Sequence, residues 1–277
     1  MTSTKDDAET RLRQFARQAG QLRRAPAASR TALTAIKEFQ RERLARAHAD
    51  LLQSERYRLA ARFFLDELYG IKDFSSRDEE LARMIPSMSR LLPAAALGTI
   101  ADGIELDAIS EELDGAMATL LESGGAAAVP PAGGLAAARS SVPGSPAPGT
   151  TPPGAKGRSS PGVAPVLTEE RYLALYRAVG RRAMRARQID LVENVGRELD
   201  RLVAKPFLFR ILKGMEGPAR LAGLGRMQSF LVTGFEAFRH MHGAEDFIRI
   251  IAARERATMH ANFSEGTGPV APPGPMK

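Results

Sequence analysis

The chain has 277 residues, of which 44% are hydrophobic, and a formal net charge of +7. This length allows one large domain or two small ones with a buried core. The chain contains no cysteine, which excludes disulfide frameworks, thiolate metal centres and cysteine nucleophiles. The N-terminus has no apolar signal segment, and no run approaches the ~18 apolar residues of a membrane span, so we expect a cytoplasmic protein without membrane association.

Helical periodicity predicts every regular element of the first 123 residues. Apolar residues recur at helical spacing, and no segment alternates as a half-buried strand does. Ser29 and Ser76 are expected N-caps, the second within a capping box with Glu79. Pro86 predicts a bend or a new start, and Pro93 predicts the first residue of another helix. The expected helices span 7–24, 29–51, 57–68, 76–92 and 93–120.

Residues 124–166 are rich in Pro, Gly and Ala and nearly free of large apolar side chains. Such a segment cannot bury enough surface to offset its ordering entropy, so we expect a disordered linker. The tail at 264–277 has the same composition and carries the same expectation. Between them, Thr168 is the expected N-cap of a helix that reaches Met184. Further helices are expected at 189–202, 207–215, 219–242 and 244–262.

Charge is distributed unevenly, with a net charge of −9 over residues 63–122 and +6 over residues 167–277. Arg177, Arg181 and Arg185 are spaced to lie on one face of a helix. Such a row can neutralise successive phosphates, so association with nucleic acid is one interpretation. An acidic row of similar spacing consists of Asp107, Glu111 and Asp114. Pairing between the two rows inside the protein, or plain solvation, is the interpretation that we favour.

The most distinctive segment is the heptad Phe-Phe-Leu-Asp-Glu-Leu-Tyr at residues 63–69, which Gly70 follows. Gly70 suits the left-handed position after a helix, because glycine has no Cβ to clash with the backbone. We expect the apolar side chains of the heptad to pack in the core or against a partner, with the core favoured. They are Phe63, Phe64, Leu68 and Tyr69.

This heptad resembles the signature of the FFLEELY-motif proteins, a bacterial family of unknown function. Asp66 stands where the name has its first Glu, which keeps the charge and shortens the side chain. Residues 70–78, 91–93 and 228–235 are similar to that family as well. The resemblance therefore covers both helical parts and skips the linker. It implies no reaction, substrate or cofactor.

Histidines are the residues to weigh as ligands of a cofactor. The chain has four histidines, and it lacks the paired Glu-x-x-His motifs of a di-iron bundle, so no metal site is predicted. His48 lies beside a leucine-rich stripe and His240 follows Phe235 and Phe238, so either has the setting of an axial haem ligand. A lone histidine on a helix is more often structural, and no bound cofactor is predicted.

These patterns predict an all-α, multi-helix bundle built from residues 1–123 and 167–263, joined by the disordered linker. We expect the two segments to pack into one composite domain, and two independent bundles are the alternative. No catalytic constellation is apparent, so the favoured function is a non-enzymatic interaction or regulatory protein that binds a protein partner or a second copy. The alternatives are a helical protein that binds a cofactor or an apolar ligand, and a nucleic-acid-associated protein that uses the arginine row.

Overall fold

The computed structural model describes residues 4–68, 75–124 and 167–264. Every regular element in these ranges is helical, which confirms the predicted all-α class. The helices before residue 125 are α1 (Thr4–Arg24), α2 (Arg30–Ala47), α3 (Ala49–Gln53), α4 (Arg58–Phe63), the π-helix η1 (Phe64–Leu68), α5 (Ser75–Leu91) and α6 (Ala94–Glu122). Those after residue 166 are α7 (Glu169–Val179), α8 (Arg182–Val203), α9 (Pro206–Gly214), α10 (Glu216–Leu221), α11 (Gly225–His240) and α12 (Glu245–Phe263). Of the predicted linker and tail, all but Gly124 and Ser264 lie outside the described residues.

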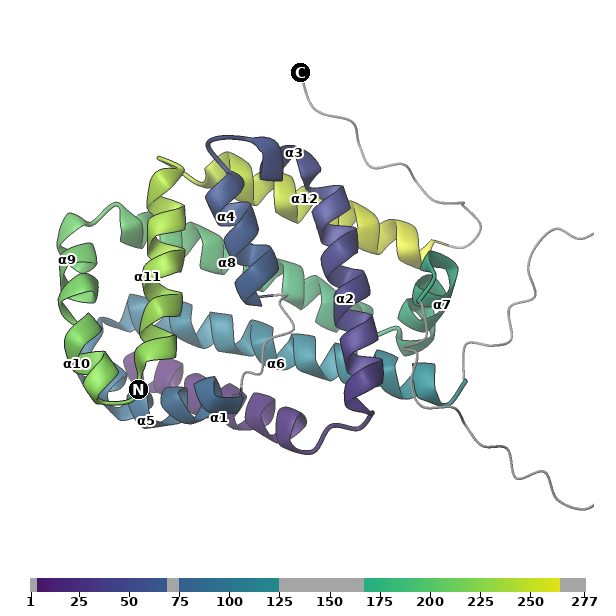
Figure 1. Cartoon of the computed structure of the whole chain (residues 1–277), viewed down its shortest axis with the longest axis horizontal. Coiled ribbons are helices and arrows are strands. Elements are labelled where there is room, and N and C mark those ends of the chain that lie inside the picture. The colour runs from purple at the N-terminus through teal and green to yellow at the C-terminus, as the bar shows by residue number, and fades with distance from the viewer. Residues whose placement is uncertain (1–3, 69–74, 125–166, 265–277) are drawn as a thin grey trace, which may run out of the picture.

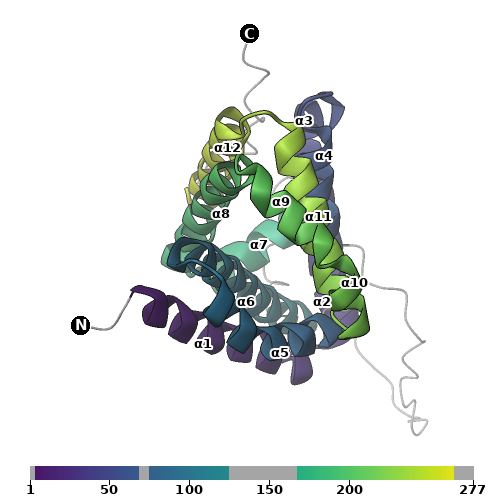
Figure 2. The ribbon, with the colours of Figure 1, turned by 90° about the vertical axis from the view of Figure 1, so that its left-hand side faces the viewer.

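The helices form two layers that cross each other (Figures 1 and 2). Helices α1, α5, α6, α8 and α12 run along the long axis of the molecule, and α2, α4 and α11 cross over them. Helix α6 packs against α1, α2, α7 and α8. Because α7 and α8 follow residue 166, helices from both segments pack against each other. The domain boundaries at 123–124 and 166–167 stay a prediction.

Buried apolar side chains form cores that join helices of the two segments. One core lies among α2, α6 and α7 and includes Ile36, Met117 and Leu175. Another joins α3 and α4 to α8, α11 and α12 around Phe238 and Phe247. Full burial of a side chain of this size stabilises the folded state by about 1.5–3 kcal/mol. These cores therefore hold together helices that are far apart in the sequence.

Two of the expected helix caps are confirmed. The hydroxyl oxygen of Ser29 accepts a hydrogen bond of 3.2 Å, and that of Thr168 one of 3.3 Å, each from the backbone N–H three residues later. Pro93 precedes α6 as its N-cap instead of being its first residue. The side chain of Ser76 lies outside the described part of the chain, so its capping box stays a prediction.

Two expected helices differ in their course. Helix α5 continues through Pro86 without a new start, and a bend at this proline, the other expectation, stays a prediction. The helix expected over 168–184 is broken, because Gly180 and Arg181 have positive φ angles of 63° and 51°. Glycine reaches this conformation without a steric penalty, since it has no Cβ. The chain turns there, and the arginine row expected on one helix is divided between α7 and α8.

Candidate functional site

Helices α9 and α10 lie at one end of the molecule and bury little of their surface (Figure 1). Four large apolar side chains are exposed there: Phe207 (51%), Ile211 (54%), Met215 (42%) and Leu221 (92%). The first three are four residues apart, so they form one stripe along the helix. We name these four residues the α9–α10 face. Neighbouring apolar side chains exposed together are typical of an interaction site.

The opposite side of α9 is attached to α11. The ring of Phe209 stacks on that of Phe235 with 5.5 Å between the centroids, and the guanidinium of Arg239 lies 3.9 Å from the Phe209 centroid. The side-chain amide of Gln228 donates a hydrogen bond of 2.5 Å to the carbonyl of Leu212. Helix α9 therefore has two apolar sides, one covered by α11 and one exposed.

The surroundings of the α9–α10 face are positively charged. Five basic residues and one acidic residue lie between positions 205 and 226, which is a net charge of +4. Three of the basic side chains form no ion pair or hydrogen bond with any residue that the structure describes, namely Lys205, Arg210 and Arg220. The face thus combines an apolar stripe with cations that are available to a partner.

Phe63 and Phe64 of the heptad pack in the core that joins α4 to α11 and α12. Phe63 is buried, and its ring centroid lies 5.3 Å from that of Phe230. Gly234 on α11 faces it so closely that a Cβ atom there would lie 2.7 Å from the Cζ atom of Phe63. Phe64 begins η1, and π-helical turns are frequent at functional sites. The other predicted packing residues lie outside the described side chains: Leu68, Tyr69 and Gly70.

A groove of about 290 Å³ lies beside the heptad, between α2 and the segment from α3 to η1. The heptad residue Asp66 borders it and accepts a hydrogen bond of 2.7 Å from the Nη2 atom of Arg41. Both side chains are about half exposed, so this ion pair contributes only about 0–1 kcal/mol. The pair links η1 to α2 on the surface.

The two histidines considered as haem ligands have polar or exposed surroundings. His48 is buried, with its Nε2 atom 3.2 Å from an oxygen of Glu255, which also accepts from Arg43 at 2.7 Å. Burial would raise the pKa of Glu255, but Arg43 and His48 outweigh it and lower this pKa to about 2. His240 is exposed, and its Nε2 atom lies 3.3 Å from the carbonyl oxygen of Glu55. These polar contacts give the haem interpretation no support within residues 4–68, 75–124 and 167–264.

The three arginines expected to form an exposed row have separate environments. Arg177 donates a hydrogen bond of 2.7 Å to a backbone carbonyl of α12, and Arg181 pairs with Glu112 of α6 at 2.6 Å. Arg185 is only 5% exposed. The expectation of one continuous row is wrong, because the turn at Gly180 and Arg181 separates Arg177 on α7 from Arg185 on α8.

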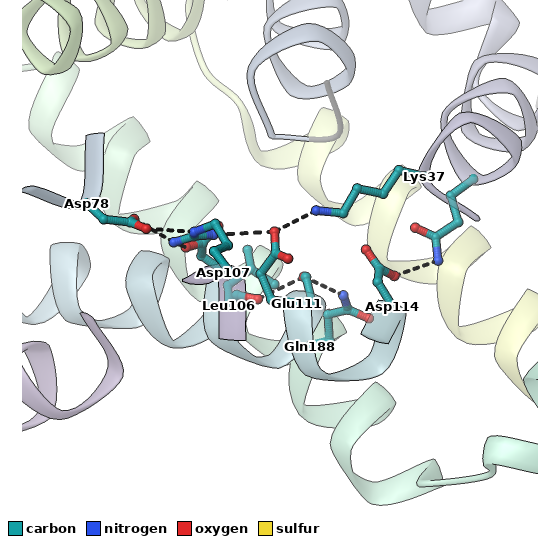
Figure 3. A network of polar contacts seen from close by, with 10 residues as sticks. Lys37, Asp78, Leu106, Asp107, Glu111, Asp114 and Gln188 are labelled. Carbon is teal, nitrogen blue, oxygen red and sulfur yellow. Dashed lines mark hydrogen bonds and ion pairs between the residues drawn. The ribbon is translucent and has the colours of Figure 1, made fainter. Parts of the chain in front are cut away.

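The acidic row of α6 pairs with residues near the N-terminus instead of with that arginine row (Figure 3). Arg23 of α1 bonds Asp107 at 2.8 Å and Glu111 at 3.3 Å, and it holds both oxygens of Asp78 at 2.6 and 2.7 Å. Lys37 of α2 lies 2.6 Å from the same oxygen of Glu111. This network joins α1, α2, α5 and α6 and explains the acidic composition of α6 as structural.

The family can be stated from a comparison of the sequence with known domains. Residues 19–139 and 157–269 match the family described as Domain of unknown function (DUF8198). The chain belongs to this family. The matched residues of this DUF8198 protein include the heptad and the α9–α10 face. Comparisons with curated proteins and with solved structures gave no significant match. Among the described helices, none has the length and apolar character needed to cross a membrane.

The sequence predicts α9 as a helix, but the exposure of one of its sides was not expected. The signal was present in two doublets of large apolar residues, at 207–208 and at 211–212, on a segment between Pro206 and Gly214. A helix of nine residues with apolar side chains on two sides must pack both sides against other parts of the protein, or against a partner, to remove them from water. In the described structure, α11 covers one of them.

Proposed function

We propose that this DUF8198 protein is a non-enzymatic helical interaction protein that binds an acidic protein partner through the α9–α10 face. The supporting observation is the exposed stripe of Phe207, Ile211 and Met215 within a segment of net charge +4. Apolar contact would supply affinity, and the cations would select and orient a partner of opposite charge.

The stripe is large enough to matter energetically. About half of each of its three side chains is exposed. Covering these halves would contribute about 1 kcal/mol each, or about 3 kcal/mol together. This corresponds to about a hundredfold in the dissociation constant. A second copy of the chain would bring the same positive charge to the interface, which favours an acidic partner over self-association.

We further propose that the protein is cytoplasmic and belongs with the FFLEELY-motif proteins, on the strength of the heptad at 63–69 and the absence of cysteine. The buried position of Phe63 supports a structural role for that heptad.

Site-specific photo-cross-linking in the native host tests the interaction directly. A photoreactive residue in place of Ile211 should give one dominant cross-linked protein, acidic at the points of attachment, in a yield that falls with added salt. The matched control carries the same residue in place of Leu59, an exposed apolar residue on α4. Ile211→Asp should abolish recovery of that partner, whereas Leu59→Asp should retain it. Equal cross-linking from both positions, or equal recovery by both aspartate variants, would reject the proposal.

A further inference from the structure

A second feature lies away from the α9–α10 face and is independent of it. A cavity of about 60 Å³ opens between α2, α7, α8 and α12. Polar side chains from all four helices line it, among them Gln40, Arg43, Tyr176, Arg185, Glu255 and Thr258. The lining includes two cations and one carboxylate, which is a net charge of +1.

Arg185 is the unusual member of this lining, because it is 5% exposed and has no counter-ion among the described residues. Its guanidinium lies 3.5 Å from the ring centroid of Tyr176. Its Nε atom donates to the carbonyl of Gly180 at 3.1 Å, and its Nη2 atom contacts the sulfur of Met117 at 3.6 Å. A thioether is a weak acceptor. Buried charges are normally paired with an opposite charge, so this cation lacks the partner that its burial calls for.

Two carboxylates bear on this cation, Glu255 in the same cavity wall and Asp114 outside it, and both accept hydrogen bonds from other side chains. Glu255 accepts from both Arg43 and His48. Asp114 accepts from Gln40 at 2.9 Å and is not part of the cavity wall; the charge of Arg185 acts on it, but no ion pair or hydrogen bond joins these two described residues. Within the cavity wall, Arg185 is therefore a cation without an ion-pair partner among the described residues, and Asp114 acts on its charge only from outside that wall.

We propose that this cavity binds a small monocarboxylate, of about the size of acetate, through the guanidinium of Arg185. The planar fork of an arginine matches the two oxygens of a carboxylate. A cavity needs about 10–15 Å³ to hold one water, so 60 Å³ accommodates about four to six heavy atoms. A single negative charge matches the net charge of the lining, whereas a phosphate dianion exceeds it.

Titration of the full chain with ¹³C-labelled acetate, followed by NMR and calorimetry, tests this site. Saturable binding is expected in the wild type. Arg185→Gln should weaken it about tenfold or more, because it removes a charge-assisted pair of hydrogen bonds. Arg182→Gln is the matched control, since Arg182 bonds His260 and does not line the cavity. Its affinity for acetate should equal that of the wild type.

A second variant keeps the test valid if Arg185→Gln does not fold. Thr258→Leu places a larger apolar side chain at the cavity wall without removing a charge, and this steric obstruction should also weaken acetate binding about tenfold or more. Binding that does not saturate at millimolar acetate would overturn the proposal. Equal affinity in the wild type and Thr258→Leu, or binding of inorganic phosphate in preference to acetate, would overturn it as well.

Discussion

Replacing Gly234 with alanine should destabilise the protein relative to a matched glycine-to-alanine change elsewhere. A Cβ atom at this position would lie 2.7, 3.2 and 3.3 Å from three ring atoms of Phe63. That ring is buried against Phe230 and Phe64, so it cannot move away freely. The substitution therefore inserts a methyl group into a contact between α4 and α11 that has no room for it.

The magnitude follows from two opposing effects. Alanine favours a helix interior over glycine by about 1 kcal/mol. Overpacking a tight core costs about 1–3 kcal/mol. At Gly103, in the interior of α6, a Cβ atom would have no neighbour within 4 Å, so Gly103→Ala shows the helix effect alone. Gly234→Ala should therefore be about 1–3 kcal/mol less stable than Gly103→Ala.

Urea denaturation measures this difference as a shift of the midpoint concentration of urea, provided that both variants have the same dependence of the free energy of unfolding on urea. Phe63→Leu supplies the second test, because leucine lacks the outer ring atoms that approach Gly234. Combining it with Gly234→Ala should recover part of the loss, and a double-mutant cycle should show coupling of about 1 kcal/mol. If Gly234→Ala is as stable as Gly103→Ala, the close contact between Phe63 and α11 does not exist.

Three further predictions concern buried charges. Arg23→Gln should lower the free energy of unfolding by about 3 kcal/mol or more, because it leaves three carboxylates without their shared cation, and a loss below about 1 kcal/mol would contradict the network. The free energy of unfolding should fall as pH rises between about 4 and 6. Burial raises the pKa of Asp114 from 3.8 to about 6, so the unfolded chain loses this proton at lower pH than the folded protein does. In denaturation measured as a function of pH, Asp114→Asn should remove this decrease. Glu255 has the opposite sign: despite burial, Arg43 and His48 lower its pKa from 4.5 to about 2, so its contribution is complete above pH 4.5 and lost toward pH 2. Glu255→Gln should reduce the loss of stability between pH 4.5 and pH 2, and an unchanged loss would refute this role of Glu255.

Local features of the fold could be predicted because short-range chemistry determines them. Helical periodicity identified the all-α class, and the hydroxyls of Ser29 and Thr168 marked true helix starts. The turn at Gly180 had a local signal as well, since glycine within a helical pattern often marks a helix end. The apolar spacing from Tyr172 to Met184 concealed it, because a brief left-handed turn can be followed by a second helix.

Long-range pairing could not be read from the sequence. Arg23 bonds residues 55 and 84 positions away, and only the packing of α1 against α5 and α6 brings them together. The burial of Arg185 likewise depends on how α7 and α8 meet after the turn. The exposure of Ile211 depends on which side of α9 is covered by α11, and a pattern of apolar residues does not contain that information.

Hydrogen–deuterium exchange of the full chain, alone and bound to the partner identified by cross-linking from position 211, tests the central claim most directly. Exchange across α9 and α10 should slow on binding, with α1 and α6 unchanged. Protection confined to other helices, with α9 and α10 exchanging as in the free protein, would contradict the assignment of the α9–α10 face as the interaction surface.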